Sequence, residues 1–285
     1  MKKPQVVTVF TRRNPDQTAE AMRRLIEVAA DGGVEVRVPA AEVEKHRLDE
    51  RPGAVFGADP TGPTDLAVVF GGDGTILSTL RAFADRQVPV FAFNFGAIGF
   101  LATVEHEQLE EGLQRALAGD FEVLPLPALT AETAQGRQLA VNDMSFHRRP
   151  AGRVAELGYS VAGEELGEVR CDGLVVATAA GSTGYNLANG GPVLAWGVEG
   201  FVVSFIAPHT LTARALVVAP DDALRVVNRS DSEAVELTTD GRAVCSVAPL
   251  DSVEIRFERE RALLAQVAGA TFYHRLRDKF GRLSY

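Results

Sequence analysis

Cysteine is scarce in this chain, with only Cys171 and Cys245 among 285 residues. Two cysteines cannot build the dense disulfide framework of a small secreted domain, and their scarcity is typical of a reducing cytoplasm. The five histidines are scattered, and together with the two cysteines they show no zinc-ligand spacing. The sequence therefore excludes a disulfide scaffold and predicts no protein-ligated zinc site.

Net positive charge is also absent, because 29 Lys and Arg face 38 Asp and Glu, for a net charge of −9. Broad binding to nucleic acid or to an anionic membrane needs a basic face. No apolar run approaches the span of about 20 residues that a membrane helix needs. The sequence predicts neither nucleic-acid nor membrane partners, although a few local donors suffice to bind a small anion in an acidic protein.

The best-known nucleotide fingerprints are missing. Gly57 and Gly62 have the Walker spacing, but Pro63 stands where the lysine should be. No G-x-G-x-x-G follows a predicted strand, and Ser182 lies in G-S-T-G rather than in G-x-S-x-G. These absences argue against a P-loop enzyme, a nicotinamide dehydrogenase and an α/β-hydrolase.

The first 120 residues alternate predicted strands and helices. Strands are expected at 5–10, 34–38, 66–70 and 88–94, and helices at about 14–31, 75–85 and 105–118. The strand at 66–70 is apolar on both faces, which suits a parallel strand covered by helices on each side. Residues 40–64 are rich in Gly and Pro towards their end and are expected to form a mobile loop. The repeated β-α units predict a doubly wound, Rossmann-like α/β domain.

After Gly119 the pattern changes to short strands punctuated by Gly, Pro, Asn and Asp, which is typical of an all-β domain such as a β-sandwich. The strands are expected at 140–146, 156–161, 174–178, 201–206, 215–218, 223–227, 234–238 and 253–257. Near the end, Phe272, Leu276 and Phe280 form one helical stripe that must be buried somewhere. The predicted organisation is an α/β domain at 1–120, a β-sandwich at 121–257 and a segment at 258–285 that returns to the α/β domain.

A glycine-rich turn follows the apolar strand and opens a helix, with the sequence Gly71-Gly72-Asp73-Gly74-Thr75. Ligands of α/β sheets bind at the carboxyl ends of strands, glycines allow close backbone approach, and N–H groups at a helix start favour phosphate. The alternative is that Asp73 only caps the helix, as Asp commonly does, although a cap needs no flanking glycines. The turn therefore predicts a phosphate loop of Gly71, Gly72 and Thr75 around one carboxylate.

A second cluster of small and hydroxyl-bearing residues, at 179–186, lies just beyond the predicted strand 174–178. It offers a surface for a flat ring and donors for phosphate, but a glycine-rich turn without a ligand uses the same residues. The pair Asn142-Asp143 interrupts an apolar segment, so these polar groups must meet a ligand or a neighbouring loop. Asp240-Gly241 is by itself an ordinary hairpin turn.

Taken together, these stretches resemble the NAD kinase family. The matching stretches are G-G-D-G-T at 71–75, N-F-G-A-I-G-F-L at 94–101, N-D at 142–143, D-G-L-V-V-A-T-A-A-G-S-T-G-Y at 172–185, G-G-P at 190–192, P-H-T-L-T-A-R at 208–214 and D-G at 240–241. The first motif is shared with lipid kinases and phosphofructokinases, whereas the whole set, in this order, spans nearly the entire chain.

The resemblance implies a cytoplasmic homodimer or homotetramer that binds NAD between its two domains and between subunits. It implies transfer of the terminal phosphate of ATP, or of polyphosphate, to the 2′-hydroxyl of the adenosine ribose of NAD, with Mg²⁺ bridging the donor phosphates. Asp73 matches the family's catalytic base. Positions that match substrate contacts are Gly74, Asn142, Asp143, Arg153, Arg170, Asp172, Ala180, Thr183, Gly184, Tyr185, Asn186, Ala188 and Arg242.

Some of these positions depart from the family pattern. Asp143 replaces the usual Glu and is one methylene shorter, and the sequence T-A-A-G at 178–181 replaces T-P-T-G. Gly184 replaces the usual Ala, and Ala188 replaces a frequent Ser. None of the departures removes Asp73, but they leave the preference between NAD and NADH open.

Two other functions are compatible with parts of the sequence. A lipid kinase of the diacylglycerol type also joins G-G-D-G to a β-sandwich, but it would carry G-T-x-N-D where this chain has Asn94-Phe95-Gly96. A non-catalytic nucleotide sensor would not need Asp73. NADP formation from NAD and ATP separates the kinase from both.

Overall fold

The computed structural model describes residues 1–48, 52–96, 99–150, 152–269 and 271–281. Its contacts divide the chain into two compact units. Met1–Pro125 and Ala262–Tyr285 form the first, here called the α/β unit, and Leu126–Arg261 form the second, the β unit. The divisions fall at 125/126 and 261/262, a few residues beyond the boundaries expected from the sequence.

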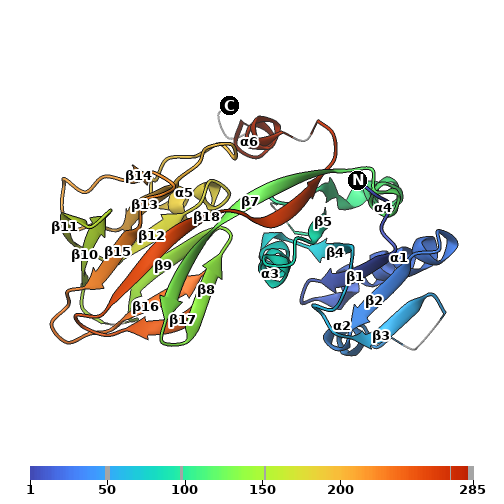
Figure 1. Ribbon diagram of the computed structural model, residues 1–285, viewed down its shortest axis with the longest axis horizontal. Coiled ribbons are helices and arrows are strands. Elements are labelled where there is room, and N and C mark those ends of the chain that lie inside the picture. The colour runs from blue at the N-terminus through green and yellow to red at the C-terminus, as the bar shows by residue number, and fades with distance from the viewer. Residues whose placement is uncertain (49–51, 97–98, 151, 270, 282–285) are drawn as a thin grey trace. The chain divides into compact units, whose positions relative to one another are not determined.

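A parallel sheet forms the centre of the α/β unit, with strand order β5-β4-β1-β2-β3 (Figure 1). Its strands are β1 (Val6–Thr11), β2 (Glu35–Pro39), β3 (Ala54–Ala58), β4 (Leu66–Gly71) and β5 (Pro89–Asn94). On its far side β5 also pairs in parallel with the short β6 (Val104–Glu105) and with the end of β18 (Ser252–Gln266). The predicted parallel sheet is confirmed.

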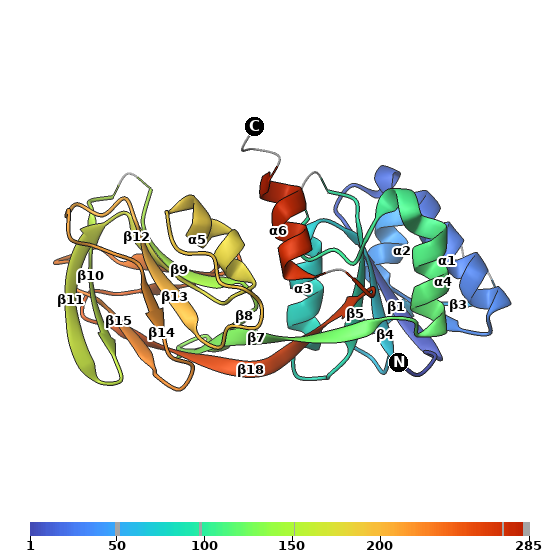
Figure 2. The ribbon, with the colours of Figure 1, turned by 90° about the horizontal axis from the view of Figure 1, so that it is seen from above.

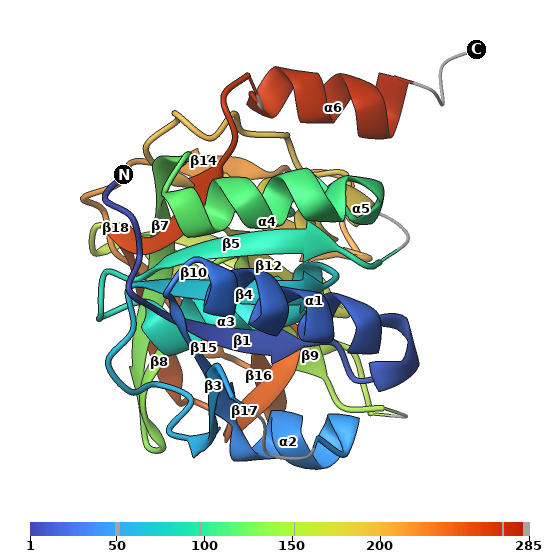
Figure 3. The ribbon, with the colours of Figure 1, turned by 90° about the vertical axis from the view of Figure 1, so that its right-hand side faces the viewer.

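Helices cover both faces of this sheet. The helices are α1 (Ala19–Asp31), α2 (Ala40–His46), α3 (Asp73–Phe83) and α4 (Leu109–Ala118), with short 3-10 turns at Pro15–Gln17 and His106–Gln108. Figure 3 shows α1 and α4 side by side on one face, where Leu66, Val68 and Phe70 of β4 pack beneath them. On the other face, Phe83 of α3 meets the ring of Phe10 at 5.9 Å. The unit is thus doubly wound, as the alternating pattern predicts.

The expectation of a mobile loop over 40–64 is wrong. Residues 49–51 lie outside the described part, but α2 and β3 occupy much of the remainder, and β3 pairs in parallel with β2 from Val36↔Ala54 onwards. The Gly and Pro residues that suggested a loop flank this edge strand or lie within it. Pairing with β2 supplies the hydrogen bonds that local propensity does not predict.

Two antiparallel sheets form the β unit. One has the order β14-β13-β12-β9-β16-β17, and the other joins β11, β10, β15 and β18 (Figure 1). In the second sheet, β7 pairs with β18 and β8 (Figure 2). The strands are β7 (Glu122–Thr133), β8 (Gly136–Ala140), β9 (Asp143–Arg148), β10 (Ala155–Val161), β11 (Glu164–Cys171), β12 (Gly173–Ala177), β13 (Phe201–Ile206), β14 (Leu216–Val218), β15 (Leu224–Asn228), β16 (Val235–Thr239) and β17 (Arg242–Val247). Phe146 and Leu174 of one sheet share a core with Leu157 and Ile255 of the other, which confirms the sandwich.

Four strands of the β unit, β7, β8, β11 and β17, were not expected from the sequence. Two prolines, Pro125 and Pro127, obscure β7, while β11 and β17 are polar edge strands with little apolar alternation. The last strand, β18, continues nine residues past the expected end at 257, first through the charged residues 258–261, of which Arg259 and Glu260 are exposed, and then through the buried residues 264–266.

The C-terminal helix α6 (Phe272–Phe280) belongs to the α/β unit, as expected. Thr271 caps it by accepting the His274 N–H at 3.2 Å. Its apolar stripe meets Phe100, whose ring centroid lies 5.8 Å from that of Phe272 and 6.1 Å from that of Phe280. No helix in the described part of the chain is long and apolar enough to cross a membrane.

Candidate active site

The glycine-rich turn joins β4 to α3 at the carboxyl edge of the parallel sheet. Gly72 occupies the N-cap position, and Asp73 is the first residue of α3, so the alternative of Asp73 as the cap is wrong. The Asp73 carboxylate turns to the segment that follows β5. It accepts the Phe100 N–H at 2.9 Å and the Leu101 N–H at 3.2 Å. Two peptide groups thus fix the direction of this carboxylate.

Close packing explains two glycines around the turn but not a third. A Cβ at Gly71 would lie 2.7 Å from Thr75 Oγ1 and 2.8 Å from Thr75 Cβ, and a Cβ at Gly96 would lie 3.2 Å from Gly72 Cα. At Gly74, in contrast, no described atom other than those of its chain neighbours and of the backbone of its own helix lies within 4 Å of the position that a Cβ would take. Protein packing therefore does not require a glycine there, whereas close approach of a ligand to the start of α3 would.

A pocket of about 510 Å³ opens beside the turn. Its lining comes from the carboxyl ends of β1, β4 and β5 and consists of Arg12, Arg13, Asn14, Gly72, Asp73, Gly74, Thr75 and Gly96. Two arginines and the N–H groups at the start of a helix make such a pocket suitable for phosphate groups. Sequence reasoning missed both arginines. Their position directly after the predicted first strand could have identified them, because the carboxyl ends of β1 and β4 lie at the same edge of the sheet, where Asp73 is.

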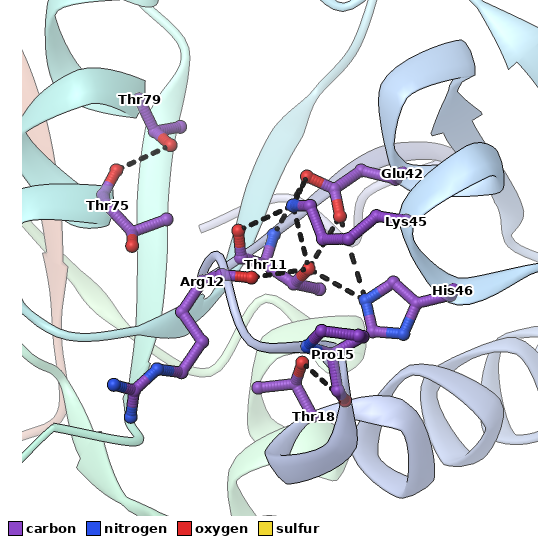
Figure 4. A network of polar contacts seen from close by, with 9 residues as sticks. All are labelled: Thr11, Arg12, Pro15, Thr18, Glu42, Lys45, His46, Thr75 and Thr79. Carbon is purple, nitrogen blue, oxygen red and sulfur yellow. Dashed lines mark hydrogen bonds and ion pairs between the residues drawn. The ribbon is translucent and has the colours of Figure 1, made fainter.

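A buried polar cluster of Thr11, Glu42, Lys45 and His46 fixes the end of β1, just before these arginines (Figure 4). Glu42 is 6% exposed and accepts the Thr11 hydroxyl at 2.6 Å, the Thr11 N–H at 3.2 Å and Lys45 Nζ at 2.7 Å. Burial lowers the pKa of His46, whose Nε2 lies 2.8 Å from Thr11 Oγ1. The cluster anchors the segment that carries Arg12.

Arg12 points away from the cluster in Figure 4. Its Nη1 donates to the carbonyl oxygen of Phe95, which ties the end of β1 to the segment after β5. Nearby, the hydroxyl of Thr79 donates to the Thr75 carbonyl at 3.0 Å, one turn further along α3. The Arg12 N–H also donates to the Phe70 carbonyl at 2.9 Å, and the Phe95 N–H donates to the Gly71 carbonyl at 3.0 Å. Hydrogen bonds thus join the ends of β1, β4 and β5 at the pocket wall.

Burial is the main influence on the carboxyl of Asp73 and raises its pKa. The N–H groups of Phe100 and Leu101 act in the opposite direction, as do the positive charges of Arg275 and Lys279 on α6. The result is a carboxylate that is more basic than a solvent-exposed Asp and has a fixed orientation, which suits a proton acceptor.

In the β unit, the Asp240-Gly241 turn does more than close the hairpin between β16 and β17. The Asp240 carboxylate accepts the N–H groups of Val141 at 3.1 Å, Asn142 at 2.7 Å and Asp143 at 3.1 Å. Asn142 therefore lies at a break between β8 and β9, and not inside one strand as expected. Charge-assisted bonds to three successive N–H groups hold this break in place.

The turn after β12 packs directly on Asn142. Thr178 donates its N–H to the Asn142 carbonyl at 2.9 Å and its hydroxyl to the Val141 carbonyl at 2.7 Å. A Cβ at Gly181 would lie 2.1 Å from the same Asn142 oxygen, so only glycine fits there. The side-chain oxygen of Asn142 is buried, and none of the described residues donates to it. A buried amide oxygen of this kind is suited to accept a hydrogen bond from a ligand.

The outer face of β9 is polar. Asp143 and His147 alternate with core residues and point to this face, where the His147 ring stacks on Tyr185 at 5.7 Å. Burial, followed by the charge of Asp240, raises the pKa of Asp143 to about 7. Burial also raises the pKa of Tyr185, and the charges of Asp143 and Asp172 add to this effect. The Tyr185 ring is thus within electrostatic reach of both carboxylates.

Asp172 lies at the opposite end of β12 from Asn142. Antiparallel pairing sets Gly173 against His147 and Ala177 against Asp143, a separation of about 13 Å at the usual rise per residue. Asp172 pairs with Arg148 at 2.5 Å. The predicted polar residues therefore line a surface that runs along β9 and β12, and they do not meet at one point.

The remaining predicted contacts divide by exposure. Thr183 is half-buried, Ala180 is buried, and the exposed members are Gly184, Tyr185, Ala188, Arg153, Arg170 and Arg242. Asn186 is fully buried and donates to the carbonyl oxygens of Ser182 and Pro192, each at 3.0 Å. Its amide group therefore fastens the turn to the G-G-P stretch. The predicted residues thus form two groups, one around Asp73 in the α/β unit and one along β9 and β12 in the β unit.

No set of three or more His, Cys, Asp or Glu side chains within the described ranges could hold a metal ion. The phosphate pocket offers one carboxylate, that of Asp73. Mg²⁺ in phosphotransferases usually takes one or two carboxylates and completes its shell with substrate phosphates and water. The pocket therefore fits a cation that is held mainly by substrate phosphates and water.

Known families match both parts of the chain. The profile described as the ATP-NAD kinase N-terminal domain matches residues 7–121, and the profile of the ATP-NAD kinase C-terminal domain matches residues 141–267. The NAD kinase of Citrifermentans bemidjiense is 32% identical over 285 residues, which covers 96% of this chain and 97% of that protein. The NAD kinase of Gemmatimonas aurantiaca is 34% identical over 225 residues, with 77% and 78% covered.

Two solved structures of kinases for NADH or NAD are also similar to this chain. A yeast NADH kinase complexed with NADH matches with a TM-score of 0.88 and 25% identity, over 100% of this chain and 90% of that chain. An NAD kinase from Archaeoglobus fulgidus in complex with ATP matches with a TM-score of 0.69 and 27% identity, over 98% and 97%.

Proposed function

We propose, because this chain belongs to the NAD kinase family, that Asp73 is the general base of its reaction. The chain is an NAD kinase, which transfers a phosphoryl group to the 2′-hydroxyl of the adenosine ribose of NAD. The assignment of Asp73 as the base rests on the placement of its carboxylate. It lines the phosphate pocket and is oriented by two peptide N–H groups.

The phosphate donor occupies the pocket around the G-G-D-G-T turn. Arg12 and Arg13 provide positive charge, and the start of α3 provides backbone N–H groups. ATP is the proposed donor, since the kinase from Archaeoglobus fulgidus was solved in complex with ATP. Gly74 leaves room for the donor to approach the helix start.

In the transfer, the ribose 2′-oxygen forms a bond to the terminal phosphorus as the bond from that phosphorus to the bridging oxygen breaks, and ADP leaves. Asp73 accepts the hydroxyl proton late in this step. Its raised pKa favours proton uptake, and the N–H groups of Phe100 and Leu101 hold one geometry. When bound, Mg²⁺ would supply charge neutralisation on the donor phosphates and would be held mainly by those phosphates and water, because Asp73 serves as the base.

NAD is recognised by the polar surface of the β unit. Asn142 offers a buried amide oxygen, and Tyr185 offers an exposed ring. The further proposed substrate contacts are Gly74 in the α/β unit and, in the β unit, Asp143, Arg153, Arg170, Asp172, Ala180, Thr183, Gly184, Asn186, Ala188 and Arg242. Of these, Asn186 acts by shaping the turn. A cytoplasmic homodimer or homotetramer is the proposed state, and the molar mass in solution tests the assembly.

The test is an activity panel with the purified protein. NAD and NADH are each offered with ATP or polyphosphate in the presence of Mg²⁺, and phosphorylated product is measured. The proposal expects NADP from NAD and ATP. Thermal stabilisation by NAD without turnover in any combination would instead identify a nucleotide sensor.

A further inference from the structure

The C-terminal helix contacts the segment that orients Asp73. Arg275, in the middle of α6, donates from Nη1 to the carbonyl oxygen of Phe100 at 3.1 Å and also to that of Ala102. Its Nη2 donates to Gln266 Oε1, at the end of β18. One planar guanidinium therefore ties α6 to two carbonyls of the segment after β5 and to the last residue of a strand.

The same segment holds the carboxylate of Asp73 on its other side. The N–H groups of Phe100 and Leu101 donate to Asp73, while the Phe100 carbonyl accepts from Arg275. The ring of Phe100 also packs against Phe272 of α6. A shift of α6 would therefore move the two donors that set the direction of the carboxylate.

Electrostatics also connects α6 to Asp73. The positive charges of Arg275 and Lys279 on α6 favour the ionised form of Asp73. Glu105 of β6 interacts with both of these cations, and its Oε1 lies 3.4 Å from Lys279 Nζ. Burial lowers the pKa of Arg275 to about 10, so Arg275 stays charged at neutral pH. Arg12 and Arg13 line the same pocket as Asp73.

We propose that Arg275 is a positioning residue for phosphoryl transfer, because it fixes residues 100–102 and thereby the orientation of Asp73. The inference rests on the proposed role of Asp73 as the base. The terminal nitrogens of Arg275 donate to protein acceptors, so the proposed role needs no contact with substrate or with the transferred phosphate. It acts through two peptide groups, in the way that an outer shell of hydrogen bonds orients a catalytic group.

The experiment compares Arg275→Met and Arg275→Lys with the control Arg277→Met. Arg277 lies on the same helix and is exposed, so its substitution removes one charge without touching residues 100–102. Arg275→Met is expected to lower kcat by about 10- to 100-fold, the usual cost of losing such an outer contact. The KM values for NAD and ATP should change far less, because the substrates keep their contacts. Arg277→Met should keep the parent kcat.

The pH profile separates positioning from simple loss of structure. Without the Arg275 charge, the pKa of Asp73 rises, so the acidic limb of kcat moves to higher pH in Arg275→Met. Arg275→Lys keeps the positive charge but loses the planar set of guanidinium donors. The acidic limb of its kcat–pH profile should therefore stay in place, while kcat falls by an intermediate amount. A limb that does not move in Arg275→Met, or a kcat loss that matches the fraction of unfolded protein, would overturn the proposal.

A double variant separates this inference from the proposed function. In an Asp73→Asn background, Arg275→Met should cause little further loss of kcat, because the carboxylate that it positions is gone. If Asp73→Asn lowers kcat and Arg275→Met alone does not, the positioning role fails while the base assignment stands. If Asp73→Asn keeps full activity, the base assignment itself fails.

Discussion

Gly74 provides a test that separates ligand approach from protein packing. Apart from its chain neighbours and the backbone of its own helix, no described atom lies within 4 Å of the Cβ that Gly74→Ala would add, and the residue lines the phosphate pocket. Ala also favours a helix over Gly by up to about 1 kcal/mol. The substitution should therefore leave the stability of the enzyme unchanged or slightly higher.

Activity should respond in the opposite direction. The added methyl group would project to where the donor phosphates approach the start of α3, and overpacking of this kind costs about 1–3 kcal/mol. The expected loss in kcat/KM for ATP is then roughly 5- to 150-fold, because about 1.4 kcal/mol corresponds to a factor of ten. NADP formation at varied ATP, together with the thermal midpoint, measures both effects on the same sample.

Gly71→Ala is the matched control, since its Cβ would meet Thr75 Cβ at 2.8 Å. That variant should lose stability by about 1–3 kcal/mol. The reasoning is refuted if Gly74→Ala binds ATP and turns over as well as the parent enzyme, or if it is destabilised as much as Gly71→Ala.

Three further outcomes follow from the structure. Glu42→Gln should lower the free energy of unfolding by about 2 kcal/mol in a urea titration, because it breaks a buried cluster around Thr11, and an unchanged midpoint would contradict this. Asn142→Ala should raise the KM for NAD by roughly 3- to 10-fold through lost hydrogen bonds, whereas an unchanged KM would remove Asn142 from the site. The raised pKa of Asp143, about 7, means that its stabilising effect is present at low pH and is lost as pH rises through 7. The stability of the parent enzyme relative to Asp143→Asn should therefore fall between about pH 4 and about pH 7, from the ordinary pKa of Asp to the raised one, and a difference that is independent of pH would exclude the shift.

The fold was predictable where hydrophobic pattern and turn chemistry agree. The apolar run of β4 and the stripe of α1 each contain enough periodic residues to identify a buried strand and a helix. The edge strands β3 and β11 were missed because pairing with a neighbour, rather than their own composition, stabilises them. Local pattern does not record such long-range pairing.

The candidate site was predictable only in part. Asp73 and its glycines stand out in the sequence because a strand end, a glycine-rich turn and a helix start coincide there. Arg12 and Arg275 lie 61 residues before and 202 residues after Asp73, and only the folded sheet and the C-terminal helix bring them to the same segment. The role of Asp240 was hidden because its three N–H partners lie about 100 residues away in sequence.

The most direct test of the central claim is the turnover of Asp73→Asn. The amide oxygen of Asn can still accept from Phe100 or Leu101, so the fold and the binding of NAD and ATP should be preserved. Loss of a general base costs about 10²-fold or more, so kcat for NADP formation should fall by at least that factor. Near-parental NADP production by Asp73→Asn would show that the residue only positions the turn, and the assignment of Asp73 as the base would then be wrong.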